Sequence, residues 1–142
     1  MGRYIVTRRL DDDGSVLLLT LGYALLALAL VLICANATSL YLAQKRLDSA
    51  ADAAALAGAD GFTLTVTEGR ATAVLTDDDV RAQAEEVVDA MGEAMTVVEA
   101  TTPDGVSARV TVTGVWHPPV VSLFVPDGVP LGATATSRTA LL

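Results

Sequence analysis

Residues 16–35 read VLLLTLGYALLALALVLICA and decide the architecture of this 142-residue chain. At about 1.5 Å of rise per residue, twenty helical residues span roughly 30 Å, which is the thickness of the hydrocarbon core of a bilayer. The stretch lies within a longer segment, residues 14–44, that contains no Asp, Glu, Lys or Arg. We therefore expect one transmembrane helix, with the lipid bilayer as a partner.

Three other interpretations compete with the transmembrane helix. A cleaved secretory signal would use the arginines before the stretch and the small residues at 35–37, but signal cores are shorter, about 7–15 residues. A lipoprotein anchored through Cys34 would need a small residue where Ile33 stands. A buried core helix would need more protein around it than so short a chain supplies. The membrane span remains the favoured interpretation.

The charges on either side of the span favour one orientation. Three arginines precede it and only Lys45 and Arg46 follow it closely, so the N-terminus is expected in the cytosol. The segment from Lys45 onward carries 14 acidic and 6 basic residues, and little positive charge opposes its export. The alternative places this acidic domain in the cytosol.

Composition and motifs argue against several classes of function. The formal net charge of −8 offers no cationic surface for phosphates, so no nucleic-acid partner is expected. The single histidine, His117, precedes two prolines at an expected strand end, and Cys34 lies in the apolar stretch, so no nucleophile and base are paired. Asp77, Asp78 and Asp79 lack the spacing of a calcium loop and fit a helix start. We expect no enzyme activity, no catalytic residue, no cofactor, no metal and no small-molecule substrate.

The helix should continue beyond the bilayer, because residues 36–57 contain neither Pro nor Gly, and it should stop around Gly58 and Gly61. Small apolar residues recur on one face at spacings of three and four, and alanines there allow another backbone to come close. The candidate packing seam consists of Leu47, Ala50, Ala51, Ala54 and Ala57. Two interpretations are open: the helix docks on its own domain, or the seam joins it to another chain.

The remaining residues predict a small α+β domain. Alternation of apolar residues and threonine at 62–67 predicts a half-buried strand that pairs through a turn with residues 71–75. Thr76 and Asp79 form a capping-box-like start of a second helix that ends at Gly92. Further strands follow from Met95, with the last over residues 131–139. We expect three to five antiparallel strands with the long helix packed on one face.

Two aromatic residues near the end of the chain have no assigned motif. We expect Trp116 and Phe124 to form a small core, and the alternative is an exposed aromatic patch.

One segment has a specific likeness. Residues 41–59 read YLAQKRLDSAADAAALAGA and follow an apolar helix and a charged leader that ends at Gly14 and Ser15. This layout resembles the TadE/TadG-like proteins of bacterial tight-adherence (Flp) pilus systems, and residues 50–59 are its specific part. The resemblance is weaker over residues 110–113 and 133–136. It implies a minor pilin or pseudopilin-like component of a type IV-related pilus, with other minor pilins or the assembly platform as partners.

The resemblance also implies a division of the chain and a candidate processing site. Residues 1–14 would be a short cytoplasmic leader, 15–59 the transmembrane and juxtamembrane helix, and 60–142 an extracytoplasmic α+β domain on a bacterial cell membrane. Leader processing would fall between Gly14 and Ser15. Processed members usually carry Glu at the fifth position after the leader, where this chain has Leu19, which favours a permanently embedded accessory role.

A second class of function stays open beside pilus assembly. The chain could be a stand-alone single-span envelope protein whose acidic outer domain binds an unrelated ligand or partner.

Overall fold

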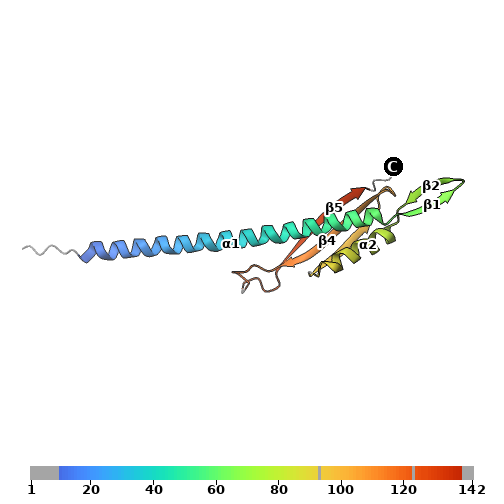
Figure 1. Cartoon of the computed structure of the whole chain (residues 1–142). Helices are drawn as coiled ribbons and strands as arrows, with labels where there is room; N and C mark the ends of the chain where they lie inside the picture. The colour runs from blue at the N-terminus through green and yellow to red at the C-terminus, as the bar shows by residue number, and fades with distance from the viewer. Residues whose placement is uncertain (1–9, 93, 123, 139–142) are drawn as a thin grey trace, which may run out of the picture.

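A long helix, α1 (Leu10–Asp60), forms the axis of the molecule, and a small domain packs around its C-terminal half (Figure 1). The computed structural model describes residues 10–92, 94–122 and 124–138. After α1 the elements are β1 (Thr63–Thr67), β2 (Arg70–Val74), α2 (Asp77–Ala90), β3 (Met95–Thr101), β4 (Ser107–Trp116) and β5 (Val129–Arg138). The predicted α+β class with antiparallel strands is confirmed.

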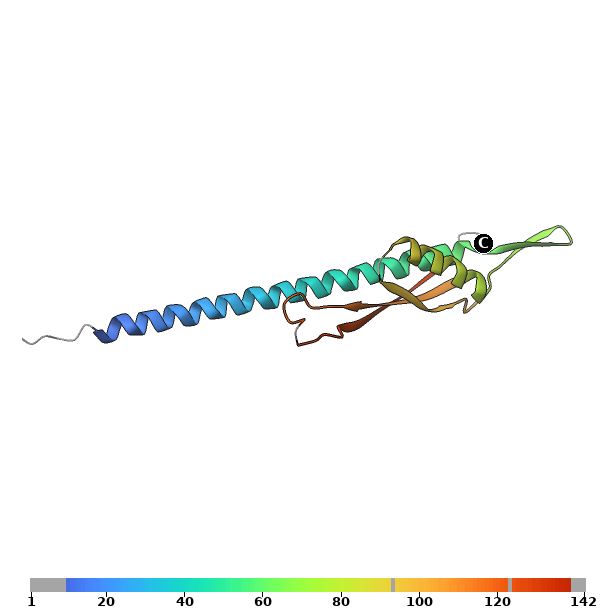
Figure 2. The same cartoon turned by 90° about the horizontal axis from the view of Figure 1, so that it is seen from below.

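The main sheet has three antiparallel strands in the order β3-β4-β5, and both helices cover one of its faces (Figure 2). Val112 in β4 lies opposite Val97 of β3 and Ala133 of β5. Alternate residues of β4 point into the core, where Ala108, Val110 and Val112 are fully buried. The strand period of two therefore places one apolar row against the helices.

The second helix begins as its sequence predicts. The Thr76 side chain accepts a hydrogen bond from the Asp79 amide at 3.2 Å, and its hydroxyl donates to the Asp79 carboxylate at 2.6 Å. Asp77 accepts the Thr102 amide at 2.6 Å, which ties the helix start to the end of β3. The helical residues end at Ala90, before the left-handed Gly92. The predicted cap of α2 is confirmed.

Gly58 lets α1 approach α2 and β4 closely. A Cβ atom at this position would lie 2.9 Å from Val80 Cγ1 and 3.2 Å from Ala108 Cβ. Gly58 is itself helical, and α1 ends at Asp60, between the two glycines that were expected to stop it. The glycine thus serves a close contact as well as the end of the helix.

A carboxylate closes the turn between β3 and β4. Asp104 accepts hydrogen bonds from the Ser107 hydroxyl and from the amides of Val106 (3.1 Å) and Ser107 (2.7 Å). Arg138 donates to the same carboxylate at 3.0 Å. These hydrogen bonds, that of the Ser107 hydroxyl foremost, hold the pKa of Asp104 well below its ordinary value.

The β1–β2 hairpin forms a separate two-stranded sheet that projects past the C-terminal end of α1 (Figures 1 and 2). Its turn places Glu68 and Gly69 at φ 53° and 77°, the signs that a type I′ turn requires. The hairpin itself was predicted correctly. Its burial was not, because Leu64 and Val66 are 60% and 70% exposed. Within the described residues no other element covers Leu64 and Val66, so the expected half-buried strand is wrong.

Candidate membrane and assembly surfaces

The N-terminal half of α1 is a bare apolar rod. Every large apolar side chain between residues 16 and 33 is exposed, and none of this window is buried inside the structure. Two of its polar side chains donate hydrogen bonds to the helix's own backbone: Thr20 to the Val16 carbonyl at 2.8 Å, and Asn36 to the Leu32 carbonyl at 2.9 Å. In lipid such groups must find partners within the helix. Among the described residues, this is the one helix long and apolar enough to cross a membrane.

The candidate processing site lies on the exposed surface of this rod. Gly14 and Ser15 are helical and exposed, and a side chain at Gly14 would meet nothing within 4 Å. Leu19 is 62% exposed on the same helix. Cleavage between Gly14 and Ser15 stays a prediction.

The alanine face of α1 packs on the chain's own domain. Leu47, Ala50, Ala51 and Ala54 are between 0% and 4% exposed, and Ala57 is half-buried. The strands β4 and β5 and the helix α2 cover this face. The burial favours the interpretation in which the helix docks on its own domain, because a face already covered leaves no surface for another chain.

Two long-range hydrogen bonds fasten the membrane-proximal end of the sheet to α1. The indole Nε1 of Trp116 donates to Ser39 Oγ at 3.0 Å, and Gln44 Nε2 donates to the Gly132 carbonyl at 3.0 Å. We call these two contacts the latch. No local sequence signal could have shown it, since its pairs lie 77 and 88 residues apart in the chain. It positions the last strands of the domain beside the point where α1 leaves its apolar stretch.

Charged groups beside the latch form an exposed network on α1. Asp48 accepts hydrogen bonds from Gln44 and from Lys45, each at 3.1 Å, and the two together lower the pKa of Asp48. The hydrogen bond to Asp48 in turn raises the pKa of Lys45, whose ammonium also lies 5.8 Å from the centroid of the Tyr41 ring. This network keeps Gln44 oriented toward β5.

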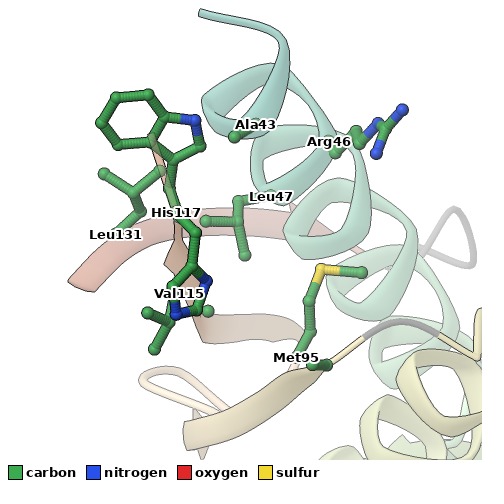
Figure 3. Close-up of a pocket in the computed structure, with 10 residues that line it drawn as sticks. Ala43, Arg46, Leu47, Met95, Val115, His117 and Leu131 are labelled. Carbon is green, nitrogen blue, oxygen red and sulfur yellow. The ribbon is translucent and has the colours of Figure 1, made fainter. Parts of the chain in front are cut away.

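A pocket of about 220 Å³ opens between α1 and the sheet just past the latch (Figure 3). Leu47, Met95 and Leu131 form apolar walls, and His117 and Arg46 stand at its edges. The lining holds no carboxylate, hydroxyl or thiol side chain that could act with the imidazole. Within the described part of the chain, no three His, Cys, Asp or Glu side chains gather closely enough to hold a metal ion.

The expected core of Trp116 and Phe124 is wrong. The Phe124 side chain is 85% exposed, whereas Trp116 is partly buried against α1. The physical reason is the turn after β4, in which the Phe124 amide donates to the Val121 carbonyl at 2.9 Å and the chain carries the ring away from the sheet. The indole of Trp116 instead donates a hydrogen bond to Ser39 of α1.

Comparison with known families agrees with the geometry of α1. Residues 14–61 match the family described as "Putative Flp pilus-assembly TadE/G-like". The chain carries a TadE/G-like segment. That segment coincides with α1 from Gly14 to one residue past its end, so it contains the apolar rod and the alanine face together. The match supports a role in Flp pilus assembly, and the resemblance seen in the sequence is confirmed.

The rest of the chain lies outside the TadE/G-like match, including both sheets and α2. Comparisons with curated proteins and with solved structures gave no match.

Proposed function

We propose that this chain is a membrane-anchored minor pilin or assembly component of a tight-adherence (Flp) pilus. The observation that carries the proposal is the coincidence of the TadE/G-like segment with one unbroken helix. The N-terminal half of that helix is bare and apolar, and its C-terminal half is the spine of a folded domain. A subunit held in the membrane by such a helix presents its domain at a fixed position outside the bilayer.

The contacts with other subunits run through the apolar half of α1 and not through the alanine face. The alanine face is occupied by the chain's own sheet and α2. In the described part of the chain the large apolar side chains of that half are all exposed, and helices in a bilayer associate by close packing of such surfaces. Other single-span pilus subunits or the assembly platform are the partners that this surface fits.

We infer further that the domain, residues 60–142, lies outside the cytoplasm and that the chain stays embedded as an accessory subunit. The arginine excess before the span supports the orientation. Leu19, an apolar residue where processed pilins carry Glu, supports retention in the bilayer and retention of the leader.

The pilus role is tested by a photo-crosslinking residue in place of Leu25, which is 58% exposed on the apolar half. We expect this variant to capture other single-span pilus subunits in native membranes, while the same residue in place of exposed Glu86 on α2 captures far less. Deletion of the gene should abolish piliation. Capture of lipid alone together with normal pili in the deletion strain would favour a stand-alone envelope protein instead.

Orientation is tested by an impermeant thiol reagent. In a Cys34→Ala background, Glu86→Cys should react in intact spheroplasts, because Glu86 is exposed on α2. Reaction only after lysis would place the domain in the cytosol. The mass of the mature chain, read by mass spectrometry, shows whether residues 1–14 are retained.

A further inference from the structure

The described residues of the connection between β4 and β5, 117–122 and 124–128, extend beyond the sheet alongside α1, on the side of its apolar half, in both views (Figures 1 and 2). We call this connection the β4–β5 loop. It reads HPPVVSLFVPDG, with one acidic residue, Asp127, and no Lys, Arg or Glu. The loop itself is therefore almost uncharged, although Arg46 of α1 lines a pocket together with its first residue, His117.

The latch fixes the position of this loop along the axis of α1, and therefore its distance from the membrane span. Trp116, the residue just before the loop, donates its indole N–H to Ser39. Ser39 follows Ala35, the last residue of the apolar stretch, by four positions, or about 6 Å along a helix. The headgroup layer of one leaflet is about 5–8 Å thick. The indole thus lies at the level of the headgroups, where Trp is enriched in membrane proteins.

Described residues of the loop present apolar side chains to water. Phe124 is 85% exposed, more than any other large apolar side chain in the described part of the chain, and Val120 and Val121 are 37% and 38% exposed. Hydrogen bonds from the amides of Phe124 and Val125 to the Val121 carbonyl, at 2.9 and 3.2 Å, hold the turn. An apolar cluster held open to water in this way points to a surface that covers it.

We propose that the β4–β5 loop is a second membrane contact of this chain. Phe124, with Val120 and Val121, enters the boundary between headgroups and acyl chains of the leaflet from which α1 emerges. The partner is a lipid surface and not a protein, because the loop continues the apolar surface of the span at the level that Trp116 marks. The inference rests on the proposed role of α1 as a membrane anchor.

The chemistry of the loop also says what kind of lipid it needs. Its lack of Lys and Arg leaves it without attraction to anionic headgroups, so burial of apolar area drives the contact. We therefore expect insertion into neutral phosphatidylcholine bilayers. With α1 and the loop both held, the domain cannot swing about the point where the helix leaves the bilayer.

The test uses the full chain in phosphatidylcholine vesicles, in a Cys34→Ala background, with an environment-sensitive fluorophore on a single introduced cysteine. Three variants are compared: Phe124→Cys in the loop, Tyr23→Cys in the span and Glu86→Cys on α2. All three positions are exposed, and Trp116 with its latch stays intact. The vesicles contain either plain lipid or lipid with doxyl quenchers attached both near the headgroup and deep in the acyl chain, because Tyr23 lies near the middle of the span.

We expect the doxyl lipid to lower the fluorescence of the label at position 124 about twofold, because side chains that lie 5–10 Å into the interface are within reach of the quencher. The fluorescence of the label at position 86 should stay unchanged. Quenching at 23 but not at 124 would overturn the loop contact while keeping the membrane anchor. Absence of quenching at both positions would overturn the anchor and the loop contact together.

Discussion

Ala54 is the position at which the packing of α1 on its domain can be tested most sharply. Its side chain is 0% exposed, and it belongs to the same core as Val80 of α2 and Val110 of β4. Ala54→Leu adds three carbon atoms where the structure leaves no solvent-accessible space. Leu and Ala differ little in helix propensity, so the change tests packing and not helix formation.

Overfilling a packed core costs about 1–3 kcal/mol in the free energy of unfolding. With the urea dependence of a small domain, about 1–3 kcal/mol per molar, a loss of about 2 kcal/mol lowers the unfolding midpoint by about 1 M. Leu56→Ala is the matched control, because it removes the same three carbons from a side chain that is 56% exposed two residues away. We expect that control to change stability by no more than about 0.5 kcal/mol.

The assay is urea unfolding of the full chain in detergent micelles, followed by the fluorescence of Trp116. This is the only tryptophan in the sequence, and its indole reports docking because it is bonded to Ser39 on α1. An Ala54→Leu midpoint equal to that of the unaltered chain would refute the packing argument. So would an equal loss of stability in the Leu56→Ala control.

Three further perturbations address local structure, and each is measured by the same urea titration. Thr76→Ala removes the cap of α2 and should cost about 1 kcal/mol, while Thr76→Ser keeps most of it; equal losses would contradict the cap. The lowered pKa of Asp104, due first to the Ser107 hydroxyl, adds stability that is complete above the ordinary Asp pKa of about 4 and is lost as pH falls below it. The difference in midpoint between the unaltered chain and Asp104→Asn should therefore shrink below pH ~4, and a constant difference would count against this. Gly128 has φ 72°, and a Cβ there would lie 2.5 Å from Val115 Cγ1, so Gly128→Ala should lose about 1–3 kcal/mol; an unchanged midpoint would show that the turn can relax.

Features that depend on neighbours in sequence could be predicted. The apolar stretch, the Thr76 cap and the alternating residues of β4 each lie within a few residues of the groups they act on, so their patterns predicted a span, a helix start and a strand. The alanine face was also visible as a periodic stripe. Its partner was not, because the same stripe suits a helix docked on its own domain or on another chain.

Features that depend on contacts between residues far apart in sequence could not be predicted. The alternation in β1 is the same whether or not another element covers Leu64 and Val66, and among the described residues none does. Trp116 and Phe124 are close in sequence, yet one turn separates them, and the indole finds Ser39 instead. Sequence period shows which side chains share a face, and tertiary structure decides which faces are covered.

Because α1 runs without a break from Leu10 to Asp60, the rotation of the domain about the helix axis is fixed relative to the apolar half of α1. An insertion of one residue at positions 36–38 would turn the domain by about 100° about the helix axis and raise it by about 1.5 Å. Seven inserted residues make almost two full turns, so they would nearly restore the original orientation of the domain about the helix axis while raising it by about 10 Å. If the chain acts in pilus assembly as proposed above, the length of this short segment sets which side of the domain faces a neighbouring subunit whose own helix is fixed in the same bilayer.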